Sequence, residues 1–356
     1  MNIAIDKTPI ISAHKYRGIG IYNYNLIKNL ERFDEKNYYY EFISGEELPK
    51  EADILHYPNL DLFRANLKIY KGVKTIVTIH DLIPLLFPKY FPIGLKGKIS
   101  WLRQKKTLDK VDAVITDSLS SKEDIKKLTG FPPAKIHVVY LASSISFKKI
   151  NELEIDNLKN QIRKKYGLNN DFILYVGDVN WNKNIFGIVS AFAKIHKSYP
   201  QTDLIFVGKA FLEKDLKEKR LIDDKIVELN LERNIIKTGY VPSEDLSILY
   251  KLAKVYLEPS FYEGFGLPIL DAMFCGTPVV CSACGSIPEI VKDAAILVDP
   301  KSAASIKEGI EKVLKMSNQE IAKLRNREIE QAKKFTWEKT ARETIRVYEK
   351  VYKSAY

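Results

Sequence analysis

The sequence of 356 residues has little cysteine and no long apolar segment. Its three cysteines all fall between Cys275 and Cys284, whereas a disulfide framework spreads its cysteines to join distant loops. No apolar stretch approaches the roughly 20 residues that a helix needs to cross a bilayer. The first residues also lack the basic segment, apolar run and small-residue cleavage site of a secretory signal. These absences exclude a disulfide-stapled or polytopic membrane protein and favour a cytoplasmic one.

Signatures of several common enzyme sites are missing too. The triplet Asp-x-Asp occurs nowhere, so a carboxylate-bound metal is not indicated. Cys281 and Cys284 form a C-x-x-C pair, but neither a second pair nor a nearby histidine completes a zinc site, and ordinary packing is the simpler role. Gly-x-Ser-x-Gly and Walker loops are absent. We therefore predict no metal and no bound cofactor.

Positive charge, by contrast, is in excess. The 56 Lys and Arg residues outnumber the 45 Asp and Glu residues, which gives a formal net charge of +11. Residues 1–150 carry +8 of this charge and residues 151–356 carry +3. Such an excess suggests a negatively charged partner, and composition leaves nucleic acid, anionic lipid and phosphorylated substrates open. No helix-turn-helix, zinc finger or RNP-type strand supports nucleic acid.

Short apolar runs rich in Val, Ile and Tyr alternate with helical patterns along the chain. A polar stretch at about 142–169 interrupts the series, and the alternation then restarts. Continuous apolar strands separated by helices indicate parallel sheets covered on both faces, here in two doubly wound domains. We expect strands at 2–6, 39–44, 52–58, 75–81, 112–118 and 135–141, then at 172–178, 203–209, 234–240, 253–260, 277–283 and 294–300.

The densest motif is PSFYEGFGLPILDAMFCGTP, at 259–278. A strand leads into a loop with Gly264 and Gly266, and a helix follows. Glycines just before a helix let backbone N–H groups and the positive helix end face an anion. Glu263 and Asp271 are poor phosphate ligands but good acceptors for sugar hydroxyls, so the pattern fits a nucleotide-sugar. On spacing alone, a surface Glu263 and an Asp271 that favours the helix dipole explain it equally well.

Three other segments carry candidate residues. Lys183 follows the strand that ends near Gly177, and a lysine there suits a departing diphosphate. Gly18 and Gly20 form Gly-x-Gly at a strand-to-helix turn, but the third glycine of a dinucleotide-binding fingerprint is missing. His80 follows an apolar strand and is expected to point into a cleft between the domains, with His56 as a weaker candidate. A solvated lysine, a simple turn and a structural histidine are the alternatives.

The block EGFGLPILDAMFCGTPVV resembles the signature of glycosyltransferase family 4, whose members have the GT-B fold. The family pattern has two acidic residues separated by seven others, which is the spacing of Glu263 and Asp271. The resemblance covers essentially the whole chain and is most specific at 259–289. Other segments that look like the family's are 175–177, 183–184, 238–241, 285–289 and 293–295.

The resemblance implies a retaining hexosyltransferase that uses a nucleoside diphosphate sugar and no metal. By position, Lys183 would bind the donor phosphate, Glu263 the transferred sugar and Asp271 the ribose. His80 would contact the sugar, with Asp81 on the acceptor side. The remaining donor contacts would come from Gly18, Gly20, Gly177 and the backbone groups of Gly264, Phe265, Gly266 and Leu267.

Three positions depart from the family pattern. Asp271 stands where the family usually has Glu, and Asp178 and Asn182 stand where many relatives have an arginine. Lys183 would therefore neutralise more of the diphosphate, and we expect Lys209, after the next strand end, to assist it.

The family also suggests the substrates and the domain roles. We expect residues 1–150 to form the acceptor-side domain and 165–337 the donor domain, with the last helix, about 338–356, packing back on the first. A GDP-linked mannose or rhamnose is the favoured donor, and a saccharide, lipid-pyrophosphate-linked, is the favoured acceptor in surface glycan assembly. A UDP-sugar transferase, a GT-B epimerase and a polyanion-binding non-enzyme are the alternatives.

The basic segment 94–110, GLKGKISWLRQKKTLDK, has lysines and an arginine around Ile99, Trp101 and Leu102. It is expected to form an amphipathic helix on an anionic membrane surface, at the inner face of the cell membrane. A solvated basic helix face is an equally simple interpretation.

Overall fold

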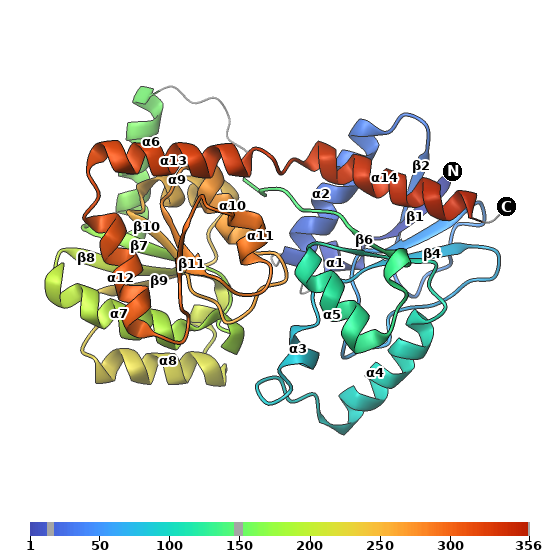
Figure 1. The fold of residues 1–356 in the computed structure, drawn as a ribbon, viewed down its shortest axis with the longest axis horizontal. Coiled ribbons are helices and arrows are strands. Elements are labelled where there is room, and N and C mark those ends of the chain that lie inside the picture. Colours follow the sequence, from blue (N-terminus) through green and yellow to red (C-terminus); the bar gives the residue numbers. More distant parts are fainter. Residues whose placement is uncertain (13–17, 146–151, 355–356) are drawn as a thin grey trace. The chain divides into compact units, whose positions relative to one another are not determined.

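The structure is a computed structural model that describes residues 1–12, 18–145 and 152–354. It divides into two compact units, Met1–Ser144 with Phe335–Tyr356, and Ile145–Lys334. Each unit contains its own six-stranded parallel sheet with helices around it (Figure 1). Among the described residues, no helix is long and apolar enough to cross a membrane.

The first unit contains a sheet of order β2-β1-β3-β4-β5-β6. The inner strands β3 and β5 are completely buried, whereas the edge strand β2 is partly exposed, as expected for a sheet covered on both faces. Its strands are Asn2–Asp6, Tyr38–Phe42, Ile54–Tyr57, Lys74–Thr78, Ala113–Thr116 and Ile136–Val138, numbered β1 to β6. Its helices are α1 Thr8–Ile11, α2 Gly18–Phe33, α3 Ile83–Leu86, α4 Gly94–Leu108, α5 Leu119–Thr129 and α14 Trp337–Lys353.

The second unit contains a sheet of order β12-β11-β10-β7-β8-β9, so β7 and β10 are neighbours although they are far apart in sequence. Its strands, β7 to β12, are Asp171–Val176, Thr202–Val207, Ile235–Gly239, Val255–Glu258, Val279–Ser282 and Ile296–Val298. Its helices, α6 to α13, are Glu152–Tyr166, Ile185–Ser198, Lys217–Glu228, Ser243–Leu252, Leu267–Phe274, Ile287–Val291, Ala303–Leu314 and Asn318–Ala332.

All twelve predicted strands are present, and the predicted class of two doubly wound α/β domains is confirmed. The described part of the polar stretch 142–169 has no strand, as expected, but it contains helix α6. Residues 146–151 of that stretch lie outside the described residues, as does Arg17 before the Gly-x-Gly turn.

Helix α14 belongs to the first unit and packs against α2. The Trp337 indole N–H donates to the Ser143 carbonyl at 2.9 Å, and the Thr340 hydroxyl donates to the Tyr140 carbonyl at 2.7 Å. Farther along, the Tyr348 hydroxyl lies 2.7 Å from His56 Nδ1 on β3. These contacts tie the last helix to the first sheet.

Two strand ends of the second sheet approach so closely that a side chain is excluded. A Cβ atom on Gly208, after β8, would lie 2.0 Å from the Gly177 carbonyl oxygen after β7. Gly177 N–H donates to the Val207 carbonyl, and Gly208 N–H donates to the Gly239 carbonyl, each at 2.9 Å. The glycines thus allow the backbone segments that follow neighbouring strands to approach closely, beside the loop that carries Lys183.

Candidate active site

Lys183 ends a short 3-10 helix, Trp181–Lys183, between β7 and α7. The next residue, Asn184, has φ 55°, and its side-chain oxygen caps α7 by accepting from Gly187 N–H at 3.2 Å. Its amide donates to the Pro259 carbonyl at 3.0 Å and to the Pro300 carbonyl at 2.7 Å. One buried asparagine therefore fixes the lysine loop against the loops after β10 and β12.

The loop after β10 is joined to the lysine loop a second time. Phe261 N–H donates to the Asn182 carbonyl at 2.7 Å, and the Asn182 side-chain amide donates to the Tyr262 carbonyl at 3.1 Å. The Trp181 ring stacks on the Phe261 ring at a centroid distance of 4.9 Å. Asn182 stands where an arginine is expected from the family pattern. Here it is a buried residue whose hydrogen bonds connect the two loops.

These connections bring Lys183 to two carboxylates. Its Nζ atom donates to Glu258 Oε1 at 2.9 Å, at the end of β10. Glu263 Oε1 lies 2.9 Å from the same Nζ atom, as an ion pair without the alignment of a hydrogen bond. The Tyr256 hydroxyl donates to the other Glu258 oxygen at 2.7 Å. We call Lys183, Glu258 and Glu263 the lysine–carboxylate cluster.

Burial sets the electrostatics of this cluster. Glu258 is fully buried, and the side chains of Lys183 and Glu263 are 14% and 8% exposed. Burial alone would lower the pKa of Lys183, but the charges of Glu258 and Glu263 outweigh it and raise that pKa well above its ordinary value. Burial raises the pKa of Glu263 to about 7, since Lys183 offsets it only in part and Glu258 adds repulsion. The lysine is therefore a cation, and Glu263 titrates near neutral pH.

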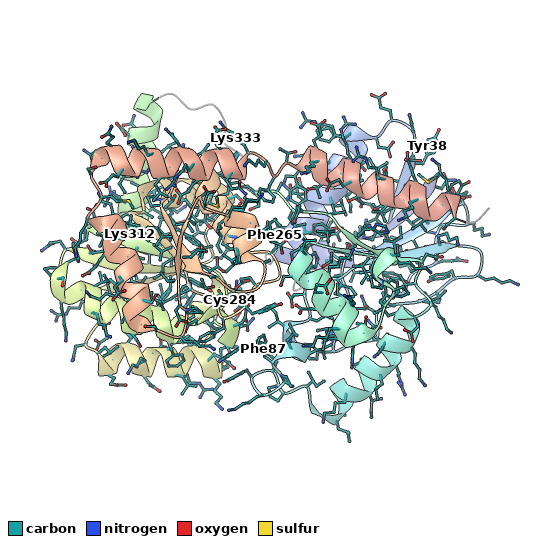
Figure 2. The ribbon with its side chains drawn as sticks, viewed as in Figure 1. Tyr38, Phe87, Phe265, Cys284, Lys312 and Lys333 are labelled. Carbon is teal, nitrogen blue, oxygen red and sulfur yellow. The ribbon has the colours of Figure 1, made fainter. Side chains whose placement is uncertain are left out.

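The backbone of Glu263 is held from the next strand end. Ser286 donates to the Glu263 carbonyl from its N–H at 3.2 Å and from its hydroxyl at 3.1 Å. Gly285 has φ 58°, and a Cβ atom there would lie 2.6 Å from the Glu263 carbonyl oxygen. Figure 2 labels Phe265 and Cys284, which mark these two loops. Gly285 is thus required both for its backbone conformation and for the close approach.

Helix α10 begins at Leu267 beside this loop. Its N-cap, Gly266, has φ 92°, a conformation that favours glycine. No side chain caps this end and no acidic residue lies in the first turn, so the positive end of the helix dipole is not neutralised locally. Asp271 is buried one turn farther on, where its charge contributes, after burial, to raising the pKa values of Tyr250 and Cys275.

Lys209 does not join the cluster. Its side chain is 77% exposed, and its nearest carboxylate is Glu213, at 4.0 Å, directly after the short 3-10 helix Lys209–Leu212. The expectation that Lys209 assists Lys183 is therefore not supported by its position. Asp178 accepts a hydrogen bond from Val179 N–H at 2.9 Å and shapes the loop after β7.

In the first unit, His80 follows β4, and both of its ring nitrogens are engaged. Nδ1 lies 2.5 Å from Asp117 Oδ2 and Nε2 lies 3.1 Å from the Pro58 carbonyl. Because both neighbours are acceptors, both nitrogens donate and the ring is an imidazolium. Burial opposes this charge, but Asp117 outweighs it and raises the pKa of His80. A sugar hydroxyl could reach Nε2 only by replacing the Pro58 carbonyl.

His56 is a buried structural residue rather than a ligand-contact residue. Its side chain lies between the Tyr348 hydroxyl, 2.7 Å from Nδ1, and the Thr78 hydroxyl, 2.8 Å from Nε2. Burial first, and the charge of His80 second, lower the pKa of His56 to about 3. The ring is therefore neutral, and the prediction of His56 as a weaker site candidate is wrong.

The remaining candidates lie at strand and helix ends of the first unit. Gly18 and Gly20 open α2, and Gly20 is buried there. Asp81 accepts a hydrogen bond from Ile83 N–H at 3.0 Å at the start of α3. Within the described ranges, no group of three or more His, Cys, Asp or Glu residues is arranged to hold a metal ion. All three cysteines are free thiols, and Cys275 and Cys281 are buried.

Comparison with known families matches both units. Residues 159–335 match the family described as "Glycosyl transferases group 1", and residues 37–142 match "Glycosyltransferase Family 4". The chain is 34% identical over 284 residues to "O-antigen chain mannosyltransferase B" of Escherichia coli, which covers 77% of this chain and 70% of that protein. It is 27% identical over 287 residues to "Serotype-specific mannosyltransferase WbdA" of Escherichia coli, covering 79% of this chain but only 34% of WbdA.

Solved structures resemble the chain over nearly its whole length. Sucrose-phosphate synthase from Thermosynechococcus elongatus has a TM-score of 0.75 and 21% identity, and covers 99% of this chain and 100% of that one. Anabaena HepE in complex with UDP and glucose has a TM-score of 0.73 and 16% identity, with 98% and 99% covered. These likenesses concern the fold, and they confirm the predicted GT-B class.

Proposed function

Because the chain belongs to glycosyltransferase family 4, we propose that it transfers mannose, with retention of configuration, from GDP-mannose to a saccharide acceptor. The observation that carries this proposal is the buried lysine–carboxylate cluster beside the uncapped start of α10. The names of the relatives support the sugar, since O-antigen chain mannosyltransferase B and WbdA are both mannosyltransferases. The acceptor is proposed to be a lipid-pyrophosphate-linked saccharide.

In the proposed reaction, the donor diphosphate lies at Lys183 and the start of α10. Negative charge develops on the diphosphate as it leaves, and a buried cation and a helix N-terminus stabilise that charge without reorganising water. Glu263 accepts from a hydroxyl of the sugar, and Asp271 accepts from the ribose. His80 and Asp81 are assigned to the sugar and the acceptor side by the family resemblance.

The acceptor hydroxyl attacks the anomeric carbon on the face that the diphosphate leaves. The new glycosidic bond forms as the bond to the phosphate oxygen breaks, and the leaving phosphate takes the acceptor proton. No protein nucleophile takes part in this scheme. Anomeric configuration is kept because attack and departure share one face.

The ion pairs of Lys183 restrict how the donor binds. With both carboxylates ionised, the cluster carries a net negative charge that repels a diphosphate. A proton on Glu263, whose pKa is about 7, makes the cluster neutral and frees one side of the lysine. We therefore propose that the donor binds the form in which Glu263 is protonated.

The charge of the first unit supports an anionic surface as a further partner. Helix α4 exposes Leu95, Ile99 and Leu102, which recur at one-turn spacing, among Lys96, Lys98 and Arg103. We propose that this face lies on anionic lipid. Leu102→Gln should weaken sedimentation with phosphatidylglycerol vesicles without changing turnover of a water-soluble acceptor.

The donor proposal is tested by nucleotide binding and turnover in the full chain. GDP at a hundredfold excess over its Kd should stabilise the protein by about 2.7 kcal/mol, and UDP and ADP should do less. GDP-mannose should release GDP when a mannoside acceptor is present, and Lys183→Met should abolish that release while Lys209→Met, at an exposed lysine, keeps it. Preferential stabilisation and turnover with UDP and its sugars would instead favour a UDP-sugar transferase.

A further inference from the structure

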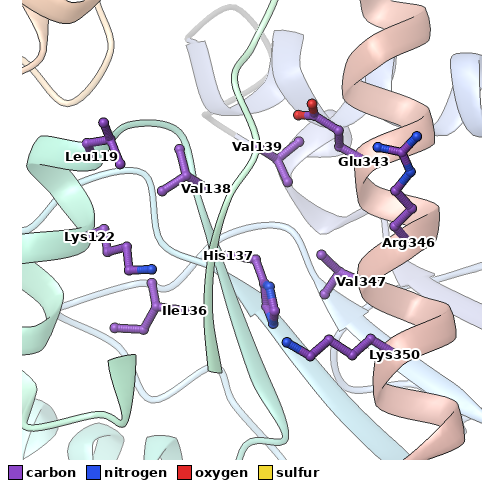
Figure 3. Close-up of a pocket in the computed structure, with 10 residues that line it drawn as sticks. All are labelled: Leu119, Lys122, Ile136, His137, Val138, Val139, Glu343, Arg346, Val347 and Lys350. Carbon is purple, nitrogen blue, oxygen red and sulfur yellow. The ribbon is translucent and has the colours of Figure 1, made fainter. Parts of the chain in front are cut away.

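The first unit contains a cavity of about 420 Å³, which none of the proposed donor residues lines. It lies between α5, the edge strand β6 and the C-terminal helix α14 (Figure 3). Its apolar part comes from Leu119 and a run of aliphatic residues on and after β6, with Val347 on α14. All its lining residues belong to the first unit, and none of them is a residue of the proposed transfer site.

Basic side chains dominate its polar part. Lys122 comes from α5, His137 from β6, and Arg346 and Lys350 from α14, and Glu343 is the one carboxylate that lines the cavity in the described part of the chain. Figure 3 shows Lys122 and Lys350 directed toward His137 from two sides. Three cations and a histidine thus surround a space with a single opposing charge.

The cations of this cavity are not ion-paired within the part of the chain that the structure describes. Lys126, one turn along α5 from Lys122, pairs with Glu123 at 3.0 Å. By contrast, the side chains of Lys122, Arg346 and Lys350 form no ion pair or hydrogen bond with any described residue. The fold therefore holds three cations around the cavity, and Glu343, its one carboxylate in the described chain, pairs with none of them.

His137 and the strand edge add hydrogen-bond donors. Burial first, then Lys350 and Lys122, lower the pKa of His137, so the ring is neutral at pH 7 and presents one N–H. Val139 N–H donates inward, to Thr116 on β5, at 2.9 Å. Since neighbouring residues of a strand alternate, Val138 N–H faces the outer edge, where β6 has no strand partner. The cavity thus offers neutral donors between its cations.

We propose that this cavity binds a phosphate-bearing ligand, with Lys122, Arg346 and Lys350 around the anion and His137 as a neutral donor. Phosphate oxygens accept charge-assisted hydrogen bonds from lysine and arginine, and a diphosphate fits the volume. The apolar part suits a ligand with a carbon portion beside the phosphate. A lipid headgroup and a free organic phosphate share this chemistry.

The test uses His137 as a local reporter. The full chain, with ¹⁵N-labelled histidines, is titrated with inorganic pyrophosphate at constant ionic strength, and the His137 signals are assigned with His137→Gln. We expect a saturable shift whose midpoint rises about tenfold in Lys122→Gln and in Lys350→Gln, the loss of one charge-assisted contact. Lys353→Gln, the same change on α14 outside the cavity, should leave the midpoint unchanged. A shift that never saturates, or that is equal in all three variants, would overturn the proposal.

A second arm distinguishes the two sources of phosphate. The same variants are sedimented with phosphatidylglycerol vesicles. Weaker sedimentation of Lys122→Gln and Lys350→Gln than of Lys353→Gln supports the site with a lipid headgroup as its ligand. Equal sedimentation of all three, together with the saturable pyrophosphate shift, supports it with a free phosphate. Binding through α4 is common to all the variants and cancels in this comparison.

Discussion

Replacing Lys183 with methionine tests the lysine–carboxylate cluster through stability as well as activity. The substitution keeps an unbranched side chain as far as the Cε position and removes the charged Nζ atom. Glu258 and Glu263 are then left buried beside each other without a cation. Removing one partner of a buried ion pair costs about 3–5 kcal/mol. We expect Lys183→Met to lower the free energy of unfolding by about that much at pH 7.5.

The deficit should depend on pH, and its sign follows from the carboxyl groups. Glu263 already has a pKa of about 7 beside the lysine, and removing Lys183 raises it further. The folded variant therefore binds more protons than the unfolded chain at every pH above the ordinary carboxyl pKa, up to the raised value. Stability falls as pH rises through that window. The deficit relative to the unmodified protein should be smaller at pH 5 than at pH 7.5.

Urea unfolding of the full chain, followed by far-ultraviolet circular dichroism at both pH values, measures this difference. Lys209→Met is the matched control, since it removes an exposed lysine from the same unit. Adding Glu258→Gln to Lys183→Met removes one of the two uncompensated charges and should recover a large part of the lost stability. If Lys183→Met unfolds within about 1 kcal/mol of Lys209→Met at both pH values, the cluster does not have the electrostatics argued for it.

Three other substitutions have defined outcomes. Glu258→Gln removes the repulsion that helps to raise the pKa of Glu263, so the pH profile of kcat/KM should move to lower pH; an unmoved profile would contradict the coupling. His56 has a pKa of about 3 in the folded protein, so its contribution lowers the free energy of unfolding by about 1.4 kcal/mol per pH unit as pH falls from 6.5 toward 3. His56→Gln should therefore reduce the difference between the free energies of unfolding measured in urea at pH 7 and pH 5. Gly285→Ala should destabilise more than Gly72→Ala, because both have positive φ but only the first would place a Cβ against Glu263; equal losses in thermal unfolding would reject the steric argument.

Sequence patterns located the strands because buried parallel strands are continuous apolar runs. Some predicted strands extend beyond the observed strand ends. The polar residues that follow the hydrogen-bonded strand accept hydrogen bonds at the start of the next helix. Strand β4 ends at Thr78, and the following Asp81 accepts from Ile83 N–H at the start of α3. The pattern cannot separate the last strand residue from the first turn residue when both are apolar or β-branched.

Glu258 was missed although its signal was present. It is a carboxylate at the end of the apolar run VYLE, where burial of an unpaired charge is energetically unfavourable. Its partner could not be found from the order of the runs, because Lys183 follows β7, which pairs with β10 across a crossover, whereas the consecutive neighbour of β10 is β11. Asp117 escaped notice for a related reason, since it meets His80 only because β4 and β5 are neighbours.

The two units share one feature, which is a buried cation paired with carboxylate at the carboxyl ends of adjacent parallel strands. In the first, the His80 imidazolium meets Asp117 after β4 and β5; in the second, Lys183 meets Glu258 and Glu263 after β7 and β10. Each buried cation is already neutralised, so the formal charge of +11 contributes little at these positions. If the donor diphosphate binds at Lys183, as proposed, its phosphate has to replace one carboxylate, and the weaker ion pair is the one to give way. Glu263 is that partner, because it makes no aligned hydrogen bond to Lys183 and takes up a proton near neutral pH, whereas Glu258 is held from both sides.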